Sequence, residues 1–542
     1  MIRSLTIGLA DVQGGCWSNQ YVVECFETHL SWVLVANGFA YKIKKALHFD
    51  FVDFSTLASR RFFCEAELQL NRRLAPDLYL SVEAITGSVE QPQIGGRGET
   101  IDYLVKMRAF DQAALWSTRV ADGSLSAAEV DALAKQIACF HLTTNRSPVH
   151  STWADKQTVA QTANENLSAL LKLAPSRKAV GLVHELVKWQ HDRHAALGHV
   201  FTDRKVRGFV RDCHGDLHAG NVMTLNNQVF AFDCIEFSDT LRWIDVMSDI
   251  AFINMDLECL GLPAIAARLL NGYLSDTGDY AGLAVLRYYR VERALVRARV
   301  SLLQATQHQA AHQLSPAAAQ VGGVRSTGPA LALALRYLEF SIREITRPAA
   351  AIMITHGLSG SGKSTFSQCL LELTSAICLR SDIERKRLYG LVGTDRNVVP
   401  VEHGLYASAA SEATYEHLLA LARQVIAAGY PVIIDAAFLK KRQRMMFRLL
   451  AVELNVPFFL FDLRAPVKSL RRRLTARQHS QHQASDANLE VLEHQIATAE
   501  PLTGEEAEVV IVIDGEARID PVGVALSCAT VLQELGIAKR RV

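Results

Sequence analysis

The sequence predicts a multidomain α/β protein with an amino-terminal α+β domain and a carboxyl-terminal α/β domain built on a parallel sheet. Residues 20–110 alternate in a strand-like way around a helical stretch at 57–74. Residues 120–345 are mostly helical by their apolar period. From residue 349 onward, short apolar strands alternate with helices, which is typical of a parallel sheet covered on both faces. The chain is also too long for one ordinary core.

The boundary between the two domains is expected at Arg347 and Pro348, which gives domains 1–346 and 347–542. The strands expected in the second domain are residues 352–355, 376–379, 432–435, 458–462 and 509–514. Each is short, apolar and followed by a helix-prone stretch, so parallel pairing is expected.

Bulk composition excludes several classes of function. Lys plus Arg number 57 and Asp plus Glu number 56, so the net charge of +1 provides no field for nucleic acid or membrane surfaces. The ten cysteines are scattered and form no metal-binding spacing, which indicates reduced thiols. No stretch of about 18 apolar residues and no signal sequence occurs. We therefore expect a soluble, cytoplasmic enzyme without a membrane partner.

Residues 357–365 read GLSGSGKST and match the phosphate-binding loop pattern in full. A strand-like segment precedes the motif and a helix-prone segment follows it, which is the context the motif requires. Backbone N–H groups of such a loop and the helix N-terminus hold phosphate oxygens, so ATP and Mg²⁺ are expected ligands. Lys363 can reach the β- and γ-phosphates, and Ser364 can hold Mg²⁺. The candidate nucleotide-binding residues are Gly357, Ser359, Gly360, Ser361, Gly362, Lys363, Ser364 and Thr365.

A second, unrelated phosphate apparatus lies upstream, where residues 213–221 read CHGDLHAGN and residues 229–233 read VFAFD. Its spacing copies a kinase catalytic loop, in which an Asn follows the Asp by five residues and a strand then ends in another Asp. Transfer of a phosphoryl group to a hydroxyl needs an acceptor for the hydroxyl proton, which suits Asp216. It also needs oxygen ligands for Mg²⁺, which suits Asn221 and Asp233.

These motifs resemble the aminoglycoside phosphotransferase and choline kinase family, over roughly residues 20–345. The resemblance implies a protein-kinase-like bilobal fold, with a small β-rich lobe over a helical lobe and ATP between them. It also implies a nucleotide-binding lysine, for which Lys42 fits best and Lys44, on the same face, is a rival. The acid paired with that lysine is Glu67, with Glu65 as second choice.

The chain departs from this family at two places. No glycine-rich loop precedes the lysine strand, where residues 27–31 read ETHLS instead. A phosphate-covering loop of this composition has to work through backbone and hydroxyl donors. After Asp233 stands Glu236, which is equally consistent with a metal or acceptor contact and with a structural carboxylate.

Residues 350–535 resemble P-loop kinases of the polynucleotide kinase, zeta-toxin and adenylylsulfate kinase groups. Asp382 follows the second strand at the edge where ligands bind and can polarise an acceptor hydroxyl, while Arg385, one turn later, can hold an acceptor anion. Asp435 resembles a Walker-B carboxylate that binds Mg²⁺. Arg473 and Arg477, four apart on a basic helix, resemble lid arginines that stabilise the transferred phosphoryl group.

The sequence therefore predicts a bifunctional kinase, in which each domain transfers the ATP γ-phosphoryl group to a small-molecule hydroxyl with Mg²⁺. One alternative is a nucleic-acid end-processing protein with a 5′-hydroxyl kinase domain, which basic runs at 385–387, 440–448 and 471–477 permit. The lack of a basic balance and of clustered aromatic residues weighs against nucleic acid. Another alternative is that one domain is a nucleotide-sensing regulatory module.

Overall fold

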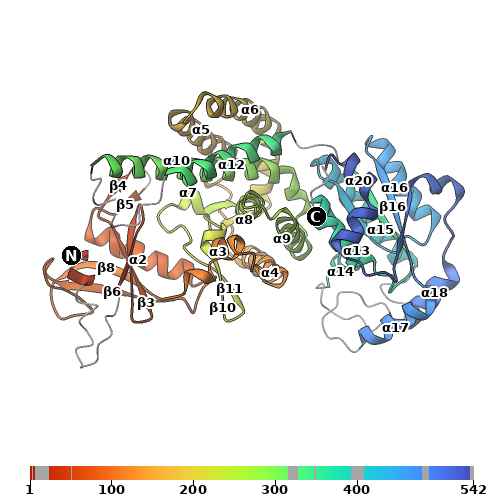
Figure 1. The fold of residues 1–542 in the computed structure, drawn as a ribbon, viewed down its shortest axis with the longest axis horizontal. Coiled ribbons are helices and arrows are strands. Elements are labelled where there is room, and N and C mark those ends of the chain that lie inside the picture. The colour runs from red at the N-terminus through yellow and green to blue at the C-terminus, as the bar shows by residue number, and fades with distance from the viewer. Residues whose placement is uncertain are drawn as a thin grey trace. The chain divides into compact units, whose positions relative to one another are not determined.

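The computed structural model describes residues 1–2, 4–6, 23–49, 52–314, 327–346, 350–391, 408–478 and 488–537 (Figure 1). The chain forms two compact units: unit 1 comprises Met1–Thr162 and Phe201–Asp256, and unit 2 comprises Ala163–Val200 and Leu257–Val542. The chain crosses between them within α5 (Lys156–Leu173), α6 (Arg177–Val206) and α8 (Val246–Cys259). This division differs from the domain boundary expected after residue 346. That boundary describes where the chain can be cut into separately folding parts, and it stays a prediction.

Unit 1 is built on a six-stranded antiparallel sheet with the order β1-β2-β3-β8-β6-β7. The strands are β1 (Glu24–Glu27), β2 (Ser31–Ala36), β3 (Phe39–Lys44), β6 (Tyr79–Gly87), β7 (Pro92–Ile94) and β8 (Thr100–Arg108). Helix α2 (Leu57–Asn71) packs against β6 and β8, and it begins at Thr56, whose hydroxyl accepts from the N–H of Ser59. The helix thereby carries Glu67 to the sheet.

The rest of unit 1 consists of helices and short hairpins. The elements are β4 (His48–Phe49), β5 (Val52–Asp53), η1 (Gln112–Ala114), α3 (Trp116–Ala121), α4 (Ala127–Thr143), β9 (Val210–Asp212), η2 (Ala219–Asn221), β10 (Val222–Leu225), β11 (Gln228–Ala231), α7 (Asp239–Arg242) and β12 (Trp243–Asp245). Strands β10 and β11 connect the two candidate metal ligands. They form an antiparallel hairpin in which Val222 pairs with Ala231. This pairing brings the residues just outside the hairpin, Asn221 and Phe232, together.

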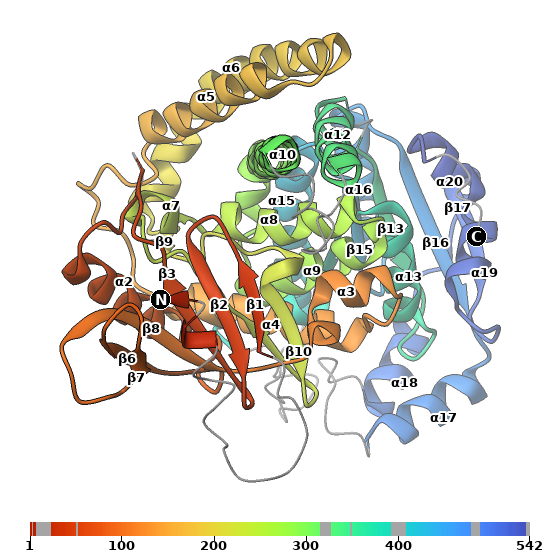
Figure 2. The same ribbon diagram turned by 60° about the vertical axis from the view of Figure 1, so that its left-hand side comes forward.

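Unit 2 contains long helices and a second sheet. Its amino-terminal helical elements are α9 (Pro263–Thr277), η3 (Tyr280–Gly282), α10 (Leu283–Leu314) and α12 (Thr327–Ile345). Helices α10 and α12 lie side by side (Figure 2). Both helices bury apolar residues, such as Leu295 and Leu338, and ion pairs such as that of Arg290 with Glu344 also link them. Among the described residues, no helix combines the length and apolar character needed to cross a bilayer.

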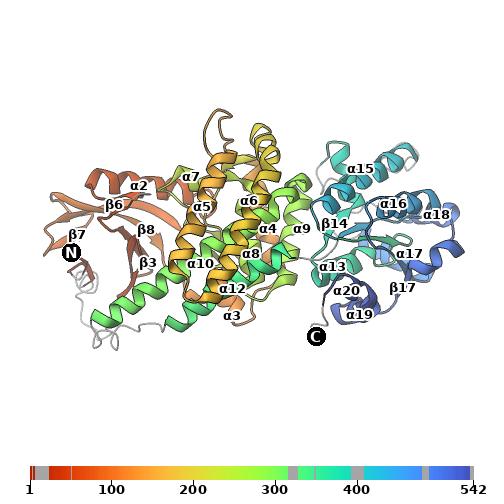
Figure 3. The same cartoon turned by 90° about the horizontal axis from the view of Figure 1, so that it is seen from above.

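The sheet of unit 2 is parallel throughout, with the order β14-β15-β13-β16-β17. Its strands are β13 (Ile352–His356), β14 (Ile377–Arg380), β15 (Val432–Asp435), β16 (Phe458–Arg464) and β17 (Val510–Asp514), so all five predicted strands are confirmed. The helices are α13 (Lys363–Thr374), α14 (Ser381–Leu388), α15 (Ser408–Ala427), α16 (Lys441–Glu453), α17 (Val467–Gln478), α18 (Leu489–Thr498), η4 (Gly504–Val509), α19 (Pro521–Ser527) and α20 (Ala529–Glu534). Helices α15 and α16 cover one face, and α13, α19 and α20 cover the other (Figure 3). The predicted mixed α/β architecture is confirmed.

Helix α9 completes the outer edge of this sheet, although it lies about a hundred residues before it in sequence. The side chain of Asn271 donates to the carbonyl of Ala376 at 3.0 Å and accepts from the N–H of Cys378 at 2.7 Å. All three residues are buried. The carboxamide therefore pairs with the edge strand β14 as a neighbouring strand would, which leaves no unpaired backbone groups at this point.

We predict that Asn271→Ala destabilises unit 2 by roughly 2–4 kcal/mol, because it leaves a buried N–H and a buried carbonyl unpaired. The matched control is Arg268→Ala on the same helix, which removes a partly exposed ion pair with Glu372 and should cost less than about 1 kcal/mol. Native-state hydrogen exchange on peptides covering β14 measures both. Equal protection in the two variants would contradict the prediction.

Candidate active sites

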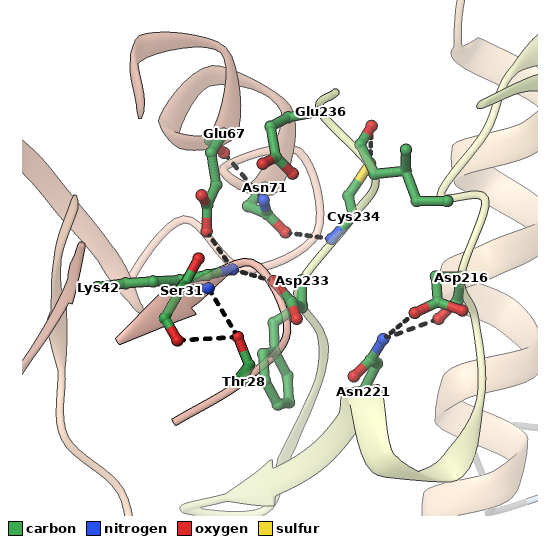
Figure 4. A network of polar contacts seen from close by, with 12 residues as sticks. Thr28, Ser31, Lys42, Glu67, Asn71, Asp216, Asn221, Asp233, Cys234 and Glu236 are labelled. Carbon is green, nitrogen blue, oxygen red and sulfur yellow. Dashed lines mark hydrogen bonds and ion pairs between the residues drawn. The ribbon is translucent and has the colours of Figure 1, made fainter. Parts of the chain in front are cut away.

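In unit 1, two lysines of β3 converge on one carboxylate of α2. Lys42 and Lys44 are two residues apart on a strand, so they share a face. The ammonium of Lys42 lies 2.8 Å from Glu67 Oε1 and 2.5 Å from Asp233 Oδ1. The ammonium of Lys44 lies 2.7 Å from Glu67 Oε2 and also contacts Glu236. Figure 4 shows Lys42 reaching between Glu67 and Asp233.

The electrostatics of this cluster are dominated by burial and by opposite charge. Burial of Glu67 disfavours its charged form, but the Lys42 and Lys44 ammonium groups outweigh this and hold the pKa of Glu67 at about 2. Burial likewise disfavours the charged form of Lys42, and the carboxylates of Asp233 and Glu67 raise its pKa well above the usual value. The lysines and Glu67 therefore stay ionised at neutral pH.

The alternative residues that the sequence left open have different surroundings in the structure. Glu65 is exposed and pairs with Arg61 one turn before it, so it does not reach either lysine. Glu236 is buried against Lys44, and burial raises its pKa. Its carboxylate is a second ion-pair partner of Lys44, beside Glu67, and it is shielded from solvent. Lys42 is the more exposed lysine, at 13% against 1% for Lys44, and it alone contacts Asp233.

The segment 213–221, which the sequence predicts to be a catalytic loop, is held together by the ring of His214. This ring is fully buried, its Nε2 lies 3.0 Å from the carbonyl of Phe232, and its Nδ1 accepts from the N–H of Asp216 at 3.3 Å. Burial lowers the pKa of His214, which favours the neutral ring that these two contacts require. His214 therefore ties the backbone of Asp216 to the strand end that carries Asp233.

Asn221 and Asp233 provide an oxygen-rich pair next to Asp216. The amide nitrogen of Asn221 donates to both the carbonyl and the Oδ2 of Asp216 at 3.0 Å (Figure 4). The side-chain oxygen of Asn221 is then the atom that can bind a metal. Asp233 stands just past β11 with a left-handed φ of 62°, and its side chain is 44% exposed. Carboxylate and amide oxygens suit Mg²⁺, so these residues fit the predicted metal.

Asp249 of α8 anchors the backbone of the same segment at His214 and Gly215. Its carboxylate accepts from the backbone N–H groups of His214 and Gly215 at 3.0 and 2.9 Å, and it lies 3.1 Å from His141 Nε2. Burial opposes ionisation of Asp249, but the hydrogen bond and charge of His141 help to hold its pKa at about 2. His141, Cys213 and Asp249 lie close enough to surround an ion. The buried hydrogen bonds of these three side chains explain the cluster as a structural anchor without a metal ion.

The turn that replaces a glycine-rich loop is closed on itself. The N–H of Ser31 donates to the hydroxyl of Thr28 at 2.9 Å, and that hydroxyl donates back to the carbonyl of Ser31 at 3.0 Å. The backbone N–H of Thr28 also donates to the Ser31 carbonyl at 2.9 Å. The sequence ETHLS thus forms a tight hairpin turn between β1 and β2 without glycine.

In unit 2, the phosphate-binding loop joins β13 to the first residue of α13, as the motif predicts. Gly357 has a φ of 141°, and a Cβ there would lie 2.6 Å from the carbonyl of Leu463, so only glycine fits. Gly362 caps α13 with a φ of 100°. Lys363 bends back across the loop and donates to the carbonyls of Gly357 and Leu358 at 2.9 and 2.8 Å. Within the loop, Ser361 and Gly360 are buried, whereas Ser364 and Thr365 are exposed at the start of the helix.

The carboxyl ends of β14 and β15 bring two carboxylates together beside this loop. Asp435 lies beside Ser364, and its pKa is raised by burial and by the neighbouring Asp382. Arg380, the last residue of β14, donates to Asp382 Oδ2 at 3.0 Å, and its Nε lies 4.0 Å from Asp435 Oδ2. Ser364 and Asp435 supply oxygen ligands that fit Mg²⁺. Sequence reasoning assigned no role to Arg380, although its place at the end of a predicted strand was a usable signal.

The remaining predicted residues lie around the loop. Arg385 follows Asp382 by one turn of α14 and lies near the hydroxyl of Tyr415. Arg473 of α17 donates to the carbonyls of Gly360 and Gly515 at 3.1 and 2.7 Å, so it contacts the loop directly. Arg477 belongs to the same helix, but its side chain lies outside the described residues.

The chain is similar to a known domain family and to several known proteins. The family described as AAA domain matches residues 352–502. A protein of Mycobacterium tuberculosis strain H37Rv, described as uncharacterized, is 29% identical over 471 residues, which cover 86% of this chain and 88% of the relative. A protein of Mycobacterium bovis with the same description has the same identity and coverage.

Solved structures similar to the chain include a choline/ethanolamine kinase family protein from Mesorhizobium loti, with 11% identity, 64% of this chain and 98% of that chain covered, and a TM-score of 0.37. They also include the APS kinase of Mycobacterium tuberculosis, with 16% identity, 35% and 99% coverage, and a TM-score of 0.26. A gluconokinase from Sinorhizobium meliloti has 18% identity, 36% and 100% coverage, and a TM-score of 0.24. The family match over residues 352–502 lies within the segment for which the motifs predicted a P-loop kinase.

Lys42 and Lys44 make a matched pair for separating nucleotide binding from stability. Lys44→Met leaves buried Glu236 without its cation and should cost roughly 3–5 kcal/mol in unfolding free energy. Lys42→Met leaves Glu67 paired with Lys44 and Asp233 partly in water, so we expect a cost of at most about 2 kcal/mol and a large loss of Mg·ATP affinity.

Both variants are measured in a Lys363→Ala background, which weakens nucleotide binding in unit 2 and leaves unit 1 as the tighter site. Thermal unfolding and equilibrium dialysis with a labelled non-hydrolysable ATP analogue provide the two readouts. Greater loss of affinity in Lys44→Met, with the protein still folded, would assign the nucleotide to Lys44 instead.

Proposed function

We propose that the chain is an ATP-dependent phosphotransferase with two sites, each transferring the γ-phosphoryl group to a hydroxyl of a small molecule with Mg²⁺. The observation that carries this proposal is that each unit contains its own complete set of a lysine, a carboxylate near the acceptor position and oxygen ligands for a metal. Phosphoryl transfer depends chiefly on positioning and charge stabilisation, and both sets supply these.

In the proposed site of unit 1, Lys42 binds the nucleotide phosphates. Glu67 orients the Lys42 ammonium group through their ion pair of 2.8 Å. Asn221 and Asp233 would hold Mg²⁺, which neutralises charge on the transferred group. Asp216 accepts the proton of the acceptor hydroxyl. The two hydrogen bonds from Asn221 orient Asp216 relative to this metal position.

In the proposed site of unit 2, the loop and the N-terminus of α13 hold the phosphates, and Lys363 reaches the β- and γ-positions. Ser364 and Asp435 would hold Mg²⁺. Asp382 orients and deprotonates the acceptor hydroxyl, with Arg385 binding an acceptor anion. Arg380 lies between the two carboxylates. Its positive charge reduces their mutual repulsion before any metal arrives.

Small-molecule acceptors are favoured over nucleic acid by the pairing of the basic runs. A surface that binds phosphodiester backbones needs arginines and lysines directed to solvent. Several arginines of the three runs, whether buried or exposed, have their charge paired with an acid of the same unit. These pairs are Arg387 with Glu384, Arg442 with Glu412, Arg444 with Glu506, and Arg471 with Glu493.

The test uses γ-labelled ATP and a library of metabolites and 5′-hydroxyl oligonucleotides, with the full chain and two variants. Asp216→Asn should abolish transfer to one set of acceptors and leave the other unchanged, and Lys363→Ala should do the reverse. General-base contributions are about 10²–10⁴-fold, so the loss is readily measured.

Three outcomes would change the proposal. Loss of all transfer in either single variant would show that the sites are coupled. Nucleotide binding without transfer in one unit would make that unit a regulatory module. Preferred labelling of oligonucleotides, lost in Lys363→Ala, would replace the small-molecule acceptor of unit 2 by a nucleic-acid end.

A further inference from the structure

One peptide unit of the phosphate-binding loop is held from both sides. The carbonyl of Leu358 accepts from the ammonium of Lys363 at 2.8 Å. The N–H of the same peptide, that of Ser359, donates to the side-chain Oε1 of Gln495 at 2.8 Å. Because a trans peptide is planar, its carbonyl and N–H point in opposite directions. Whatever fixes the direction of the N–H therefore also fixes the carbonyl that Lys363 contacts.

Gln495 lies on the inner face of α18. The helix begins at Asn488, whose side chain accepts from the N–H of Val491 at 2.9 Å. Val491 and Leu492 are buried, and Gln495 follows them by four and three residues, so it projects from the same face. Leu492 packs in an apolar cluster with Leu470 and Leu474 of α17, and Leu358 of the loop packs against that cluster. The side chain of Gln495 is thus delivered to the loop by packing.

The other end of α18 is tied to the segment that follows Asp435. Lys440 donates to the carbonyl of Thr498 at 2.7 Å, and the N–H of Glu500 donates to the carbonyl of Leu439 at 2.8 Å. Arg444, buried at the same place, donates to the carbonyl of Pro501 at 3.2 Å. The last turn of α18 is therefore fixed to the segment that follows β15, and Gln495, one turn before Thr498, makes the hydrogen bond to the loop.

We propose that Gln495 is a positioning residue of the nucleotide site, which sets the orientation of the Leu358–Ser359 peptide and through it the place of Lys363. Without an acceptor on α18, the peptide is free to rotate, and its carbonyl no longer holds Lys363 at the mouth of the loop. Lys363 then approaches the phosphates from a wider range of positions, and nucleotide binding weakens. This inference rests on the proposed nucleotide-binding function of the loop.

The test is a double-mutant cycle between Gln495→Met and Lys363→Ala, in a background of Asp233→Asn that removes a proposed metal ligand of unit 1. Methionine matches glutamine in length but has no carbonyl oxygen. The matched control is Ile496→Met, which introduces the same residue on the outer face of α18, where Ile496 is 38% exposed. Binding of Mg·AMPPNP is measured by equilibrium dialysis, and thermal unfolding checks the fold of each variant.

We expect Gln495→Met to weaken Mg·AMPPNP binding roughly 5- to 10-fold when Lys363 is present, as for the loss of one well-formed hydrogen bond. In the Lys363→Ala protein the same change should have less than about a 2-fold effect, because the lysine it positions is gone. Ile496→Met should stay within about 2-fold of the parent.

Equal effects of Gln495→Met in both backgrounds would show that Gln495 only supports the fold, and no effect in either would also overturn the inference. If Gln495→Met does not fold, Gln495→Asn, which withdraws the carboxamide by one methylene, is read with the same expectations. Absence of Mg·AMPPNP binding in the parent itself would instead overturn the proposed function of unit 2, and this inference with it.

Discussion

The carboxylate of Glu67 is fully buried and stays ionised because two ammonium groups lie within hydrogen-bond distance of it. Burying a charge is costly unless an opposite charge compensates it, so this cluster constrains the geometry around it. Strand β3 has to present Lys42 and Lys44 on one face, and α2 has to lie against the sheet at Glu67. Lys42 then reaches Asp233 at the end of the β10–β11 hairpin. The requirement for charge compensation thus joins the sheet, the helix and the β10–β11 hairpin of unit 1.

The same constraint acts in unit 2 with the charges reversed. There a single arginine, Arg380, lies between Asp382 and Asp435 at the carboxyl edge of a parallel sheet. Parallel strands end at one edge, so their terminal side chains meet and need mutual compensation. The phosphate-binding loop begins at the same edge, and its cation Lys363 contacts backbone carbonyls of the loop. In both units a cation and carboxylates are placed before nucleotide or metal is added, which limits the reorganisation that binding requires.

Much of this arrangement could be predicted from local sequence. The five strands of unit 2 are short apolar runs, and the motifs fix which residues follow them. The two-residue period of β3 put Lys42 and Lys44 on one face, but it could not show that Glu67 contacts both. Residues whose role depends on distant packing were missed: Asn271 pairs with a strand about a hundred residues later, and Gln495 reaches the loop only because α17 and α18 pack together. Such contacts follow from strand order and helix packing, which no local pattern encodes.

The central claim is that the chain contains two separate nucleotide sites, one in each unit. The most direct measurement is the stoichiometry of Mg·AMPPNP binding to the full wild-type chain by isothermal titration calorimetry, with the protein concentration determined independently. The account predicts two bound nucleotides per chain, because each unit has its own lysine and metal-type oxygens. A stoichiometry of one, at nucleotide concentrations far above the dissociation constant, would contradict it.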